Sequence, residues 1–235
     1  MSETQAVILA GGPGTRLRPM TEAIPKPMVP VNGKPFLEYE IGLLQESGIG
    51  EFVLCIGYLG ETIQNYFGNG HRLGVRIRYS YDGPKLLGPV GALKQSESLL
   101  EESFFVTYGD AYLRAPYRRI MDSLLASKKL GLMTVYQNNN RYGKSDVVVE
   151  GGYVVRFDKK NQKEEMNWIN FGVSALTKPA LELIPSSEEY CEEEFYRKLI
   201  ERKELLAFPV TNRFYEIGNP TALMEFEKFI SEQQL

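Results

Sequence analysis

Residues 5–17 read QAVILAGGPGTRL and join a short apolar run to a glycine-rich turn. The apolar run, Ala6–Ala10, has the length and composition of a buried strand. It is followed at once by GGPG, residues 11–14, whose glycines let the backbone approach a ligand closely and direct amide N–H groups at an anion. Arg16 adds a guanidinium that can bind phosphate oxygens in pairs. We therefore expect this turn to bind polyphosphate, with a triphosphate as its natural ligand.

The turn does not match the two most familiar phosphate-binding patterns. No G-K-[ST] is present to make a Walker A loop, and the spacing of Gly11, Gly12 and Gly14 departs from the G-x-G-x-x-G of dinucleotide-binding domains. Ten positions after Arg16 stands Lys26, flanked by prolines. These prolines either stiffen a surface loop or hold the lysine ammonium over the phosphates.

The pattern of apolar residues predicts an α/β fold. Short apolar runs alternate with amphipathic stretches from residue 6 to residue 137, which favours a Rossmann-like three-layer αβα sandwich with a mixed, mostly parallel central sheet. Beyond residue 138, Gly151-Gly152 separates two β-rich runs and predicts a hairpin. We expect a single domain, residues 1–235, with a small β-rich lobe at about residues 138–176. The other expected elements are strands at 51–56, 75–81, 104–108, 131–137 and 168–176, and helices at 36–44, 61–67, 93–100, 118–127 and 221–230.

Composition narrows the range of partners. The formal net charge of the 235 residues is −3, so we expect neither a nucleic acid nor an anionic membrane as partner. Cys55 and Cys191 have no metal-ligand spacing and predict no zinc site. No basic leader and no run of about 18 apolar residues occurs, which favours a cytoplasmic protein. The acidic stretch Ser186–Glu194 predicts a solvated loop and helix entry. The oligomeric state stays open.

A longer string carries a family resemblance. Residues 11–17 read G-G-P-G-T-R-L, Lys26-Pro27-Met28 follows, and Gly109-Asp110 ends the apolar run at 104–108. This combination resembles the nucleotidyltransferases that make nucleotide sugars, the family of glucose-1-phosphate thymidylyltransferase. The chain looks most like the short heptose-1-phosphate guanylyltransferase and N-acetylmuramate-1-phosphate uridylyltransferase type, and the resemblance covers nearly the whole chain. It implies an enzyme that couples a nucleoside triphosphate to a sugar 1-phosphate, releases pyrophosphate and uses Mg²⁺.

The resemblance assigns the chemistry to two basic residues and two carboxylates. Arg16 would grip the triphosphate, and Lys26 would lie near the α-phosphate, where in-line displacement develops charge. Asp110 would hold Mg²⁺ at the carboxyl end of its strand, the alternative being an aspartate that caps the following turn. Glu216 stands in the Phe214–Gly218 segment where relatives carry an aspartate, and would be either the second metal carboxylate or a structural residue beside a turn.

The resemblance also implies two sets of binding residues. Residues 87–93, LGPVGAL, resemble the base-binding turn of the family, and Asp82 would accept hydrogen bonds from N1 and N2 of guanine. GTP is therefore favoured, while UTP, CTP, dTTP and a purely local role for Asp82 stay open. The implied nucleotide-binding residues are Leu9, Gly11, Gly12, Gly14, Thr15, Arg16, Asp82, Gly88 and Gly91. The implied sugar-binding residues are Tyr142, Gly143, Asp158, Lys159, Asn170 and Gly172, with Lys159 neutralising the phosphate of the sugar.

Three alternatives share some of these features. Cytidylyl transfer to a phosphonate or to choline phosphate would use the same loop and metal. A glycosyltransferase has a related sheet but normally carries a D-x-D motif, where this chain has only Gly109–Tyr112, GDAY. A nucleotide-sensing subunit would keep the loop without catalysis, and the presence of Arg16, Lys26 and Asp110 argues against it.

Overall fold

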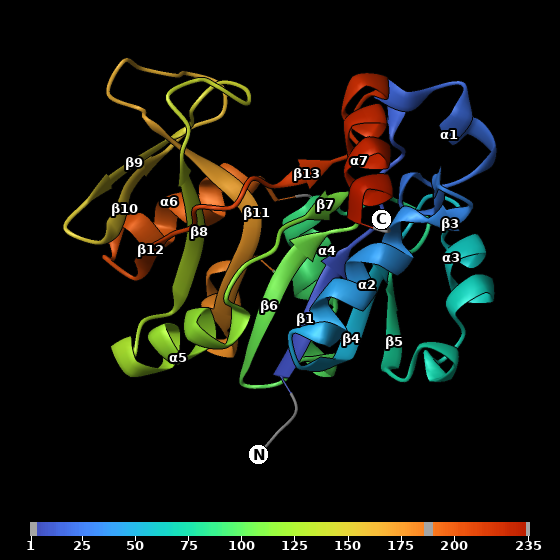
Figure 1. The fold of residues 1–235 in the computed structure, drawn as a ribbon. Coiled ribbons are helices and arrows are strands. Elements are labelled where there is room, and N and C mark those ends of the chain that lie inside the picture. Colours follow the sequence, from blue (N-terminus) through green and yellow to red (C-terminus); the bar gives the residue numbers. More distant parts are fainter. Residues whose placement is uncertain (1–3, 186–189, 234–235) are drawn as a thin grey trace.

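A nine-stranded sheet runs through the centre of the computed structural model, which describes residues 4–185 and 190–233 (Figure 1). Its strand order is β5-β4-β1-β6-β11-β8-β12-β10-β9. The strands are β1 (Thr4–Leu9), β4 (Ile49–Ile56), β5 (Arg76–Tyr81), β6 (Ser103–Tyr108), β8 (Gly131–Gln137), β9 (Val147–Glu150), β10 (Tyr153–Phe157), β11 (Trp168–Thr177) and β12 (Leu205–Pro209). β1 pairs in parallel with β4 and β6, and β5 extends this parallel half, whereas β11 is antiparallel to both β6 and β8. The expected mixed sheet is confirmed.

Helices cover both faces of the sheet because its central strands carry apolar side chains on both sides. In β1, Ala6 and Ile8 belong to one core and Val7 to the other, as the two-residue period of a strand requires. The helices α2 (Phe36–Glu46), α3 (Gly60–Phe67) and α5 (Tyr117–Ser127) close the first core. The helices α4 (Gly88–Gln95) and α6 (Glu192–Glu201) close the second. The three-layer sandwich expected from the sequence is therefore present.

A third apolar cluster joins the end of the chain to its beginning. Helix α7 (Pro220–Gln233) is the red helix of Figure 1. Its Phe226 packs against Phe36 of α2, with 4.7 Å between ring centroids. Just before it, β13 (Tyr215–Glu216) pairs antiparallel with β7 (Ala111–Tyr112). The remaining short elements are α1 (Met20–Ala23), β2 (Pro30–Val31), β3 (Lys34–Pro35) and the 3₁₀ turns Thr15–Leu17, Lys26–Met28, His71–Leu73, Glu97–Leu99 and Lys178–Leu183. Closing the chain in this way brings β13 beside the end of β6.

The structure confirms the expected hairpin and corrects the bounds of one expected helix. The hairpin at Gly151-Gly152 is confirmed, and both glycines have positive φ angles of 55° and 82°. The helix expected at residues 93–100 is wrong in its bounds, because α4 begins at Gly88 and ends at Gln95. Pro89 occupies the first turn of α4, where its missing N–H group is not needed. In the part of the chain that the structure describes, no helix is long and apolar enough to span a bilayer.

The carboxyl ends of the parallel strands meet at one edge of the sheet. Ala10 N donates to Cys55 O at 2.8 Å, Gly109 N donates to Leu9 O at 2.9 Å, and Asp82 N donates to Ile56 O at 3.0 Å. These bonds hold the glycine-rich turn, Asp82 and Gly109-Asp110 at the same edge. In open α/β sheets the crevice at this edge is where ligands bind.

Candidate active site

A cavity of about 450 Å³ opens at this edge, and we call it the loop cavity. Its walls are Leu9, Ala10, Gly11, Gly12, Pro13, Gly14, Thr15, Arg16, Lys26, Pro27, Asp82, Leu86, Gly88, Pro89, Ala92, Tyr108, Gly109, Asp110 and Gly218. All the expected nucleotide-binding residues except Gly91 lie in these walls. Gly91 is instead buried inside α4, because that helix begins earlier than expected and turns Ala92 to the cavity.

The glycine-rich turn keeps its amide groups available to a ligand. Within residues 4–185 and 190–233, the amides of Gly11, Gly12 and Gly14 donate no backbone hydrogen bond. The carbonyl groups are anchored instead: Gly11 O accepts from the amide of Tyr58 at 3.0 Å, and Gly14 O accepts from Oγ1 of Thr21 at 2.8 Å. N–H groups arranged in this way beside an arginine form an anion site.

Two glycines allow the lysine segment to approach the turn closely. Gly14 has φ 59°, and a Cβ atom there would lie 2.8 Å from Cβ of Lys26. A Cβ atom on Gly109 would lie 2.9 Å from Cγ of Pro27. Larger residues at either position would push Lys26 away from the cavity, so the glycines are required by packing as well as by any ligand.

Lys26 forms an ion pair with Asp110 in the wall of the loop cavity. Their side chains are 14% and 25% exposed, so solvent screens the pair less than it would on the surface. A lysine ammonium sits on a flexible stem and needs such a partner to stay in one place. The pair therefore fixes a positive charge at the carboxyl end of β6, next to the glycine-rich turn.

A second cavity of about 570 Å³ adjoins the first, and we call it the lobe cavity. Its walls are Arg16, Tyr108, Asp110, Ala111, Arg141, Tyr142, Lys159, Ile169, Asn170, Gly172, Arg213, Phe214, Tyr215, Glu216, Asn219, Thr221, Ala222 and Glu225. Arg16, Tyr108 and Asp110 line both cavities. Two ligands bound side by side would thus meet at these three residues.

The structure brings most of the expected sugar-binding residues to the lobe cavity. Tyr142, Lys159, Asn170 and Gly172 line it, but Gly143 and Asp158 do not. Asp158 Oδ1 accepts hydrogen bonds from the amides that follow it, at 3.0 Å from residue 160 and 2.7 Å from residue 161. Its carboxylate caps its own turn, so the structure does not support the expected contact between Asp158 and a sugar hydroxyl.

Two arginines that the sequence analysis missed complete the lobe cavity. The guanidinium carbons of Arg141 and Arg213 lie 5.1 Å and 4.7 Å from the ring centroid of Tyr142. Arg213 also pairs with Glu225 of α7. Together with Arg16 and Lys159, these residues place four cationic side chains in the wall of the lobe cavity, against three carboxylates, and such side chains can contact an anionic ligand.

Of the expected metal carboxylates, Glu216 lies on β13, and Asp110 lies in the turn just before β7, the strand with which β13 pairs. Glu216 is opposite Ala111 in the β13–β7 pair, and Ile217 N donates to Asp110 O at 3.2 Å. The carboxylate of Glu216 accepts from Gly218 N at 2.6 Å and from Asn219 Nδ2 at 3.3 Å, so it is partly engaged by its own turn. The described residues contain no group of three or more potential metal ligands. Mg²⁺ commonly takes one or two protein carboxylates and completes its shell with phosphate oxygens and water, which this pair fits.

Asp146 is a buried carboxylate that the sequence analysis did not identify. Oδ1 of Asp146 accepts from Asn170 N at 2.9 Å, and its backbone carbonyl accepts from Asp158 N at 3.0 Å. It therefore ties β11 to the turn that carries Lys159. Burial raises the pKa of Asp146 to about 6, although the amide of Asn170 acts to lower it. No local pattern marked this residue, because its partners lie on other strands.

The raised pKa of Asp146 predicts that Asp146→Asn stabilises the protein at neutral pH. Between the ordinary aspartate value of 3.8 and about 6, the folded protein holds more protons than the unfolded chain, so stability falls as pH rises through this window. The asparagine keeps an oxygen for Asn170 and carries no charge. We expect it to raise the unfolding free energy at pH 7.5 by about 1–3 kcal/mol, with the difference vanishing near pH 4.

Urea unfolding of both proteins across this pH range measures the effect. Asp122→Asn, at an exposed aspartate on α5, is the matched control and should change little at any pH. A difference between Asp146→Asn and the wild type that did not vary with pH would contradict the interpretation.

Comparison with known proteins identifies the family. A family model described as nucleotidyl transferase matches residues 5–233, so the chain belongs to the nucleotidyl transferase family. Among individual relatives, D-glycero-alpha-D-manno-heptose 1-phosphate guanylyltransferase of Campylobacter jejuni is 33% identical over 223 residues, covering 94% of this chain and 98% of the relative. The enzyme of the same name from Aneurinibacillus thermoaerophilus is 33% identical, covering 95% and 97%.

Solved structures agree with this assignment. HddC from Yersinia pseudotuberculosis, complexed with GMP-PN, is 26% identical and superposes with a TM-score of 0.77, covering 97% of this chain and 99% of that one. A UTP-bound UGPase from Acinetobacter baumannii shares the fold with a TM-score of 0.81 at 19% identity, covering 97% and 93%. The family model and the two guanylyltransferases confirm the enzyme class that the family resemblance implied.

Proposed function

We propose that this enzyme transfers a nucleotidyl group from a nucleoside triphosphate to a sugar 1-phosphate and releases pyrophosphate. One observation carries the proposal: the loop cavity and the lobe cavity share Arg16, Tyr108 and Asp110. The loop cavity has the backbone amides and the basic side chains that a triphosphate requires. The lobe cavity has four cationic side chains that can contact an anionic acceptor. The names of the two heptose 1-phosphate guanylyltransferases support an acceptor of this class.

The reaction is an in-line displacement at the α-phosphorus. A phosphate oxygen of the acceptor, held in the lobe cavity, attacks from one side while the bond to the pyrophosphate oxygen breaks on the other. Arg16 and Lys26 stabilise the negative charge on the phosphate oxygens, and the turn amides hold the departing pyrophosphate. No covalent enzyme intermediate is needed, since proximity and charge neutralisation supply the catalysis.

We propose Mg²⁺ as the metal, held by Asp110 and assisted by Glu216. It would supply further positive charge to the phosphate oxygens. Lys26 already forms an ion pair with Asp110. The carboxylate of Asp110 would therefore bind both the lysine ammonium and the metal. We propose both the Mg²⁺ site and a cytoplasmic location for this enzyme.

Asp82 makes GTP the favoured nucleotide. Its carboxylate lines the loop cavity, and Oδ2 accepts from Leu87 N at 3.3 Å. Burial raises the pKa of Asp82, as expected for a carboxylate that faces a partly dry site. As an ionised acceptor it would receive two hydrogen bonds from the N1 and N2 groups of guanine, a pattern that no other common base presents together.

Asp82→Asn should therefore weaken the preference for GTP. The amide can replace only one of the two accepted hydrogen bonds, so we expect the ratio of kcat/KM for GTP over UTP to fall by about 10- to 100-fold. Steady-state kinetics with each nucleotide at a fixed acceptor concentration gives this ratio. An unchanged ratio of kcat/KM for GTP over UTP would mean that Asp82 does not read the base.

A pyrophosphate-release screen tests the function itself. GTP, UTP, CTP and dTTP are each combined with a panel of sugar 1-phosphates and, separately, with choline phosphate and a phosphonate. We expect pyrophosphate only when a nucleotide and a sugar 1-phosphate are both present. Turnover confined to choline phosphate or the phosphonate would favour the cytidylyltransferase alternative. Nucleotide binding without any turnover would indicate a sensing subunit.

A further inference from the structure

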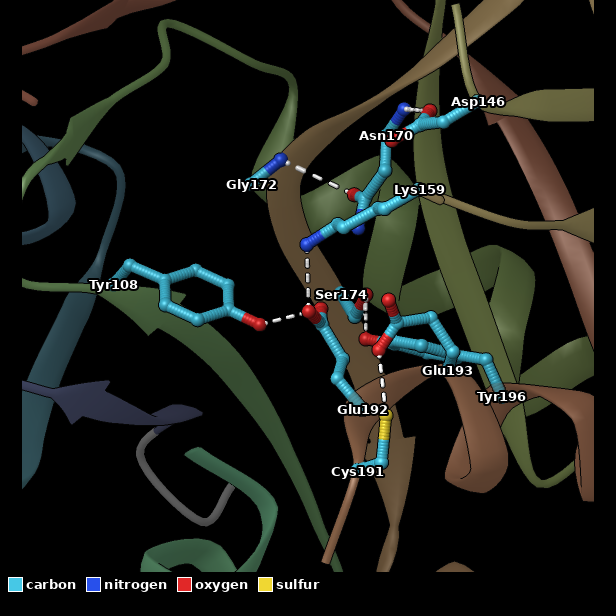
Figure 2. Close-up of polar contacts among 10 residues, drawn as sticks. All are labelled: Tyr108, Asp146, Lys159, Asn170, Gly172, Ser174, Cys191, Glu192, Glu193 and Tyr196. Carbon is cyan, nitrogen blue, oxygen red and sulfur yellow. Dashed lines mark hydrogen bonds and ion pairs between the residues drawn. The ribbon is translucent and has the colours of Figure 1, made fainter. Parts of the chain in front are cut away.

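Glu192 does not line either cavity, but it connects Tyr108, which lines both cavities, with Lys159 of the lobe cavity, where we propose that the acceptor binds. Glu192 is the first residue of α6, and its side chain is only 10% exposed. Oε1 of Glu192 accepts from the hydroxyl of Tyr108 at 2.5 Å, and Oε2 accepts from Nζ of Lys159 at 2.6 Å (Figure 2). The solvated role expected for the acidic stretch is therefore wrong for Glu192, while residues 186–189 lie outside the described residues.

These three side chains come from different parts of the fold. Tyr108 ends β6, Lys159 follows β10, and Glu192 begins α6. Tyr108 lines both cavities, whereas Lys159 lines only the lobe cavity. The carboxylate thus joins the residue at the reaction centre to the cation expected to bind the phosphate of the acceptor.

The surroundings keep Lys159 charged and aimed in one direction. Burial acts to lower the pKa of Lys159, but the charge and hydrogen bond of Glu192 outweigh it, and the pKa is raised. Asp146, on the other side, contributes to the same effect. The N-terminus of α6 favours a negative charge at Glu192 because the helix dipole is positive there. Lys159 is consequently an ammonium that is bound by Glu192 and attracted at longer range by Asp146.

The geometry leaves Lys159 able to bind an anion. Its side chain is 44% exposed and lines the lobe cavity. An ammonium has three N–H donors, and within residues 4–185 and 190–233 one of them is used, by Glu192, and two remain. Without this partner, the four-carbon stem would be free to adopt many rotamers, and ordering it again on binding would cost free energy.

We propose that Glu192 is a positioning residue that holds Lys159, against Tyr108, for the phosphate of the acceptor. The inference rests on the proposed function, in which Lys159 contacts the sugar 1-phosphate. Glu192 itself does not touch the substrate. Glu192 acts by orienting Lys159. Loss of Glu192 should therefore raise the KM for the acceptor, and only when Lys159 is present.

The test is a double-mutant cycle between Glu192→Gln and Lys159→Met, measured by pyrophosphate release. Glutamine keeps an oxygen for Tyr108 and loses the charge that orients Lys159. We expect Glu192→Gln to raise the KM for the sugar 1-phosphate by about 5- to 20-fold while the KM for the nucleotide stays within about twofold. In the Lys159→Met background, adding Glu192→Gln should change the acceptor KM by less than about twofold.

Two further variants separate positioning from folding. Glu194→Gln is the matched control, because Glu194 lies on α6 two residues after Glu192, is exposed, and forms neither an ion pair nor a hydrogen bond with Lys159. It should leave both KM values unchanged. Glu192→Asp keeps the charge on a shorter side chain and should give an intermediate acceptor KM, even if the melting temperature of Glu192→Gln falls.

The outcomes distinguish the inference from the function on which it rests. An acceptor KM unchanged in Glu192→Gln, or raised equally with and without Lys159, would overturn the positioning role while leaving the proposed function intact. Absence of pyrophosphate release from the wild type with every sugar 1-phosphate would overturn the proposed function and the role of Glu192 together.

Discussion

Lys26→Ala should lower turnover by about 10²- to 10³-fold while the melting temperature stays near that of the wild type. Lys26 is the cation held beside the glycine-rich turn by Asp110, and both line the loop cavity. Its ammonium is placed to neutralise charge that grows on the α-phosphate during displacement. Most of the loss should therefore fall on kcat, since the ground-state triphosphate keeps Arg16 and the turn amides.

A matched variant shows whether this loss is specific. Lys129 pairs with Glu204, and their side chains are 26% and 25% exposed, much as in the Lys26–Asp110 pair. Neither residue lines the loop cavity or the lobe cavity. Lys129→Ala should change stability about as much as Lys26→Ala and leave turnover unchanged. Wild-type turnover in Lys26→Ala would refute the role of this lysine.

Asp110→Asn should lower turnover still further, by about 10³-fold or more. The substitution keeps the shape of the side chain but removes the charge that orients Lys26 and that would hold the metal. Both consequences act at the point where the two cavities meet. Because the wild-type carboxylate is partly exposed and paired, the folded structure should tolerate the amide.

The metal dependence of the rate separates these two consequences. For the wild type, we expect a chelator to abolish pyrophosphate release and Mg²⁺ to restore it. In Asp110→Asn, a higher Mg²⁺ concentration should recover little activity, whereas Lys26→Ala should keep a wild-type Mg²⁺ requirement. Asp110→Asn with an unaltered rate and Mg²⁺ response would show that this carboxylate holds no metal.

The parts of the fold that the sequence predicted are those specified by local patterns. The apolar run Ala6–Ala10 lies almost wholly within β1 (Thr4–Leu9), which is buried on both faces and therefore reads as an unbroken apolar run. The glycine-rich turn directly after it is also specified locally, because Gly14 adopts a positive φ angle that favours glycine. By contrast, the start of α4 was missed, because Gly88-Pro89 resembles a turn when only propensity is considered.

The parts of the site that escaped prediction depend on contacts between distant segments. Glu192 contacts residues 33 and 84 positions away, and within its acidic stretch it looks like any other solvated glutamate. Asp146 is defined by β11 and by the turn before Lys159. Tyr108 did carry a usable signal, since it directly precedes Gly109-Asp110 at the end of a parallel strand.

The central claim is that the glycine-rich turn holds the polyphosphate of the nucleotide. A crystal structure with a non-hydrolysable GTP analogue and Mg²⁺ tests it most directly. We expect the phosphate chain to contact the amide N–H groups of Gly11, Gly12, Gly14 and Thr15 and the guanidinium of Arg16, with the α-phosphate beside Lys26. A phosphate chain bound away from these residues, for example wholly within the lobe cavity, would contradict the account.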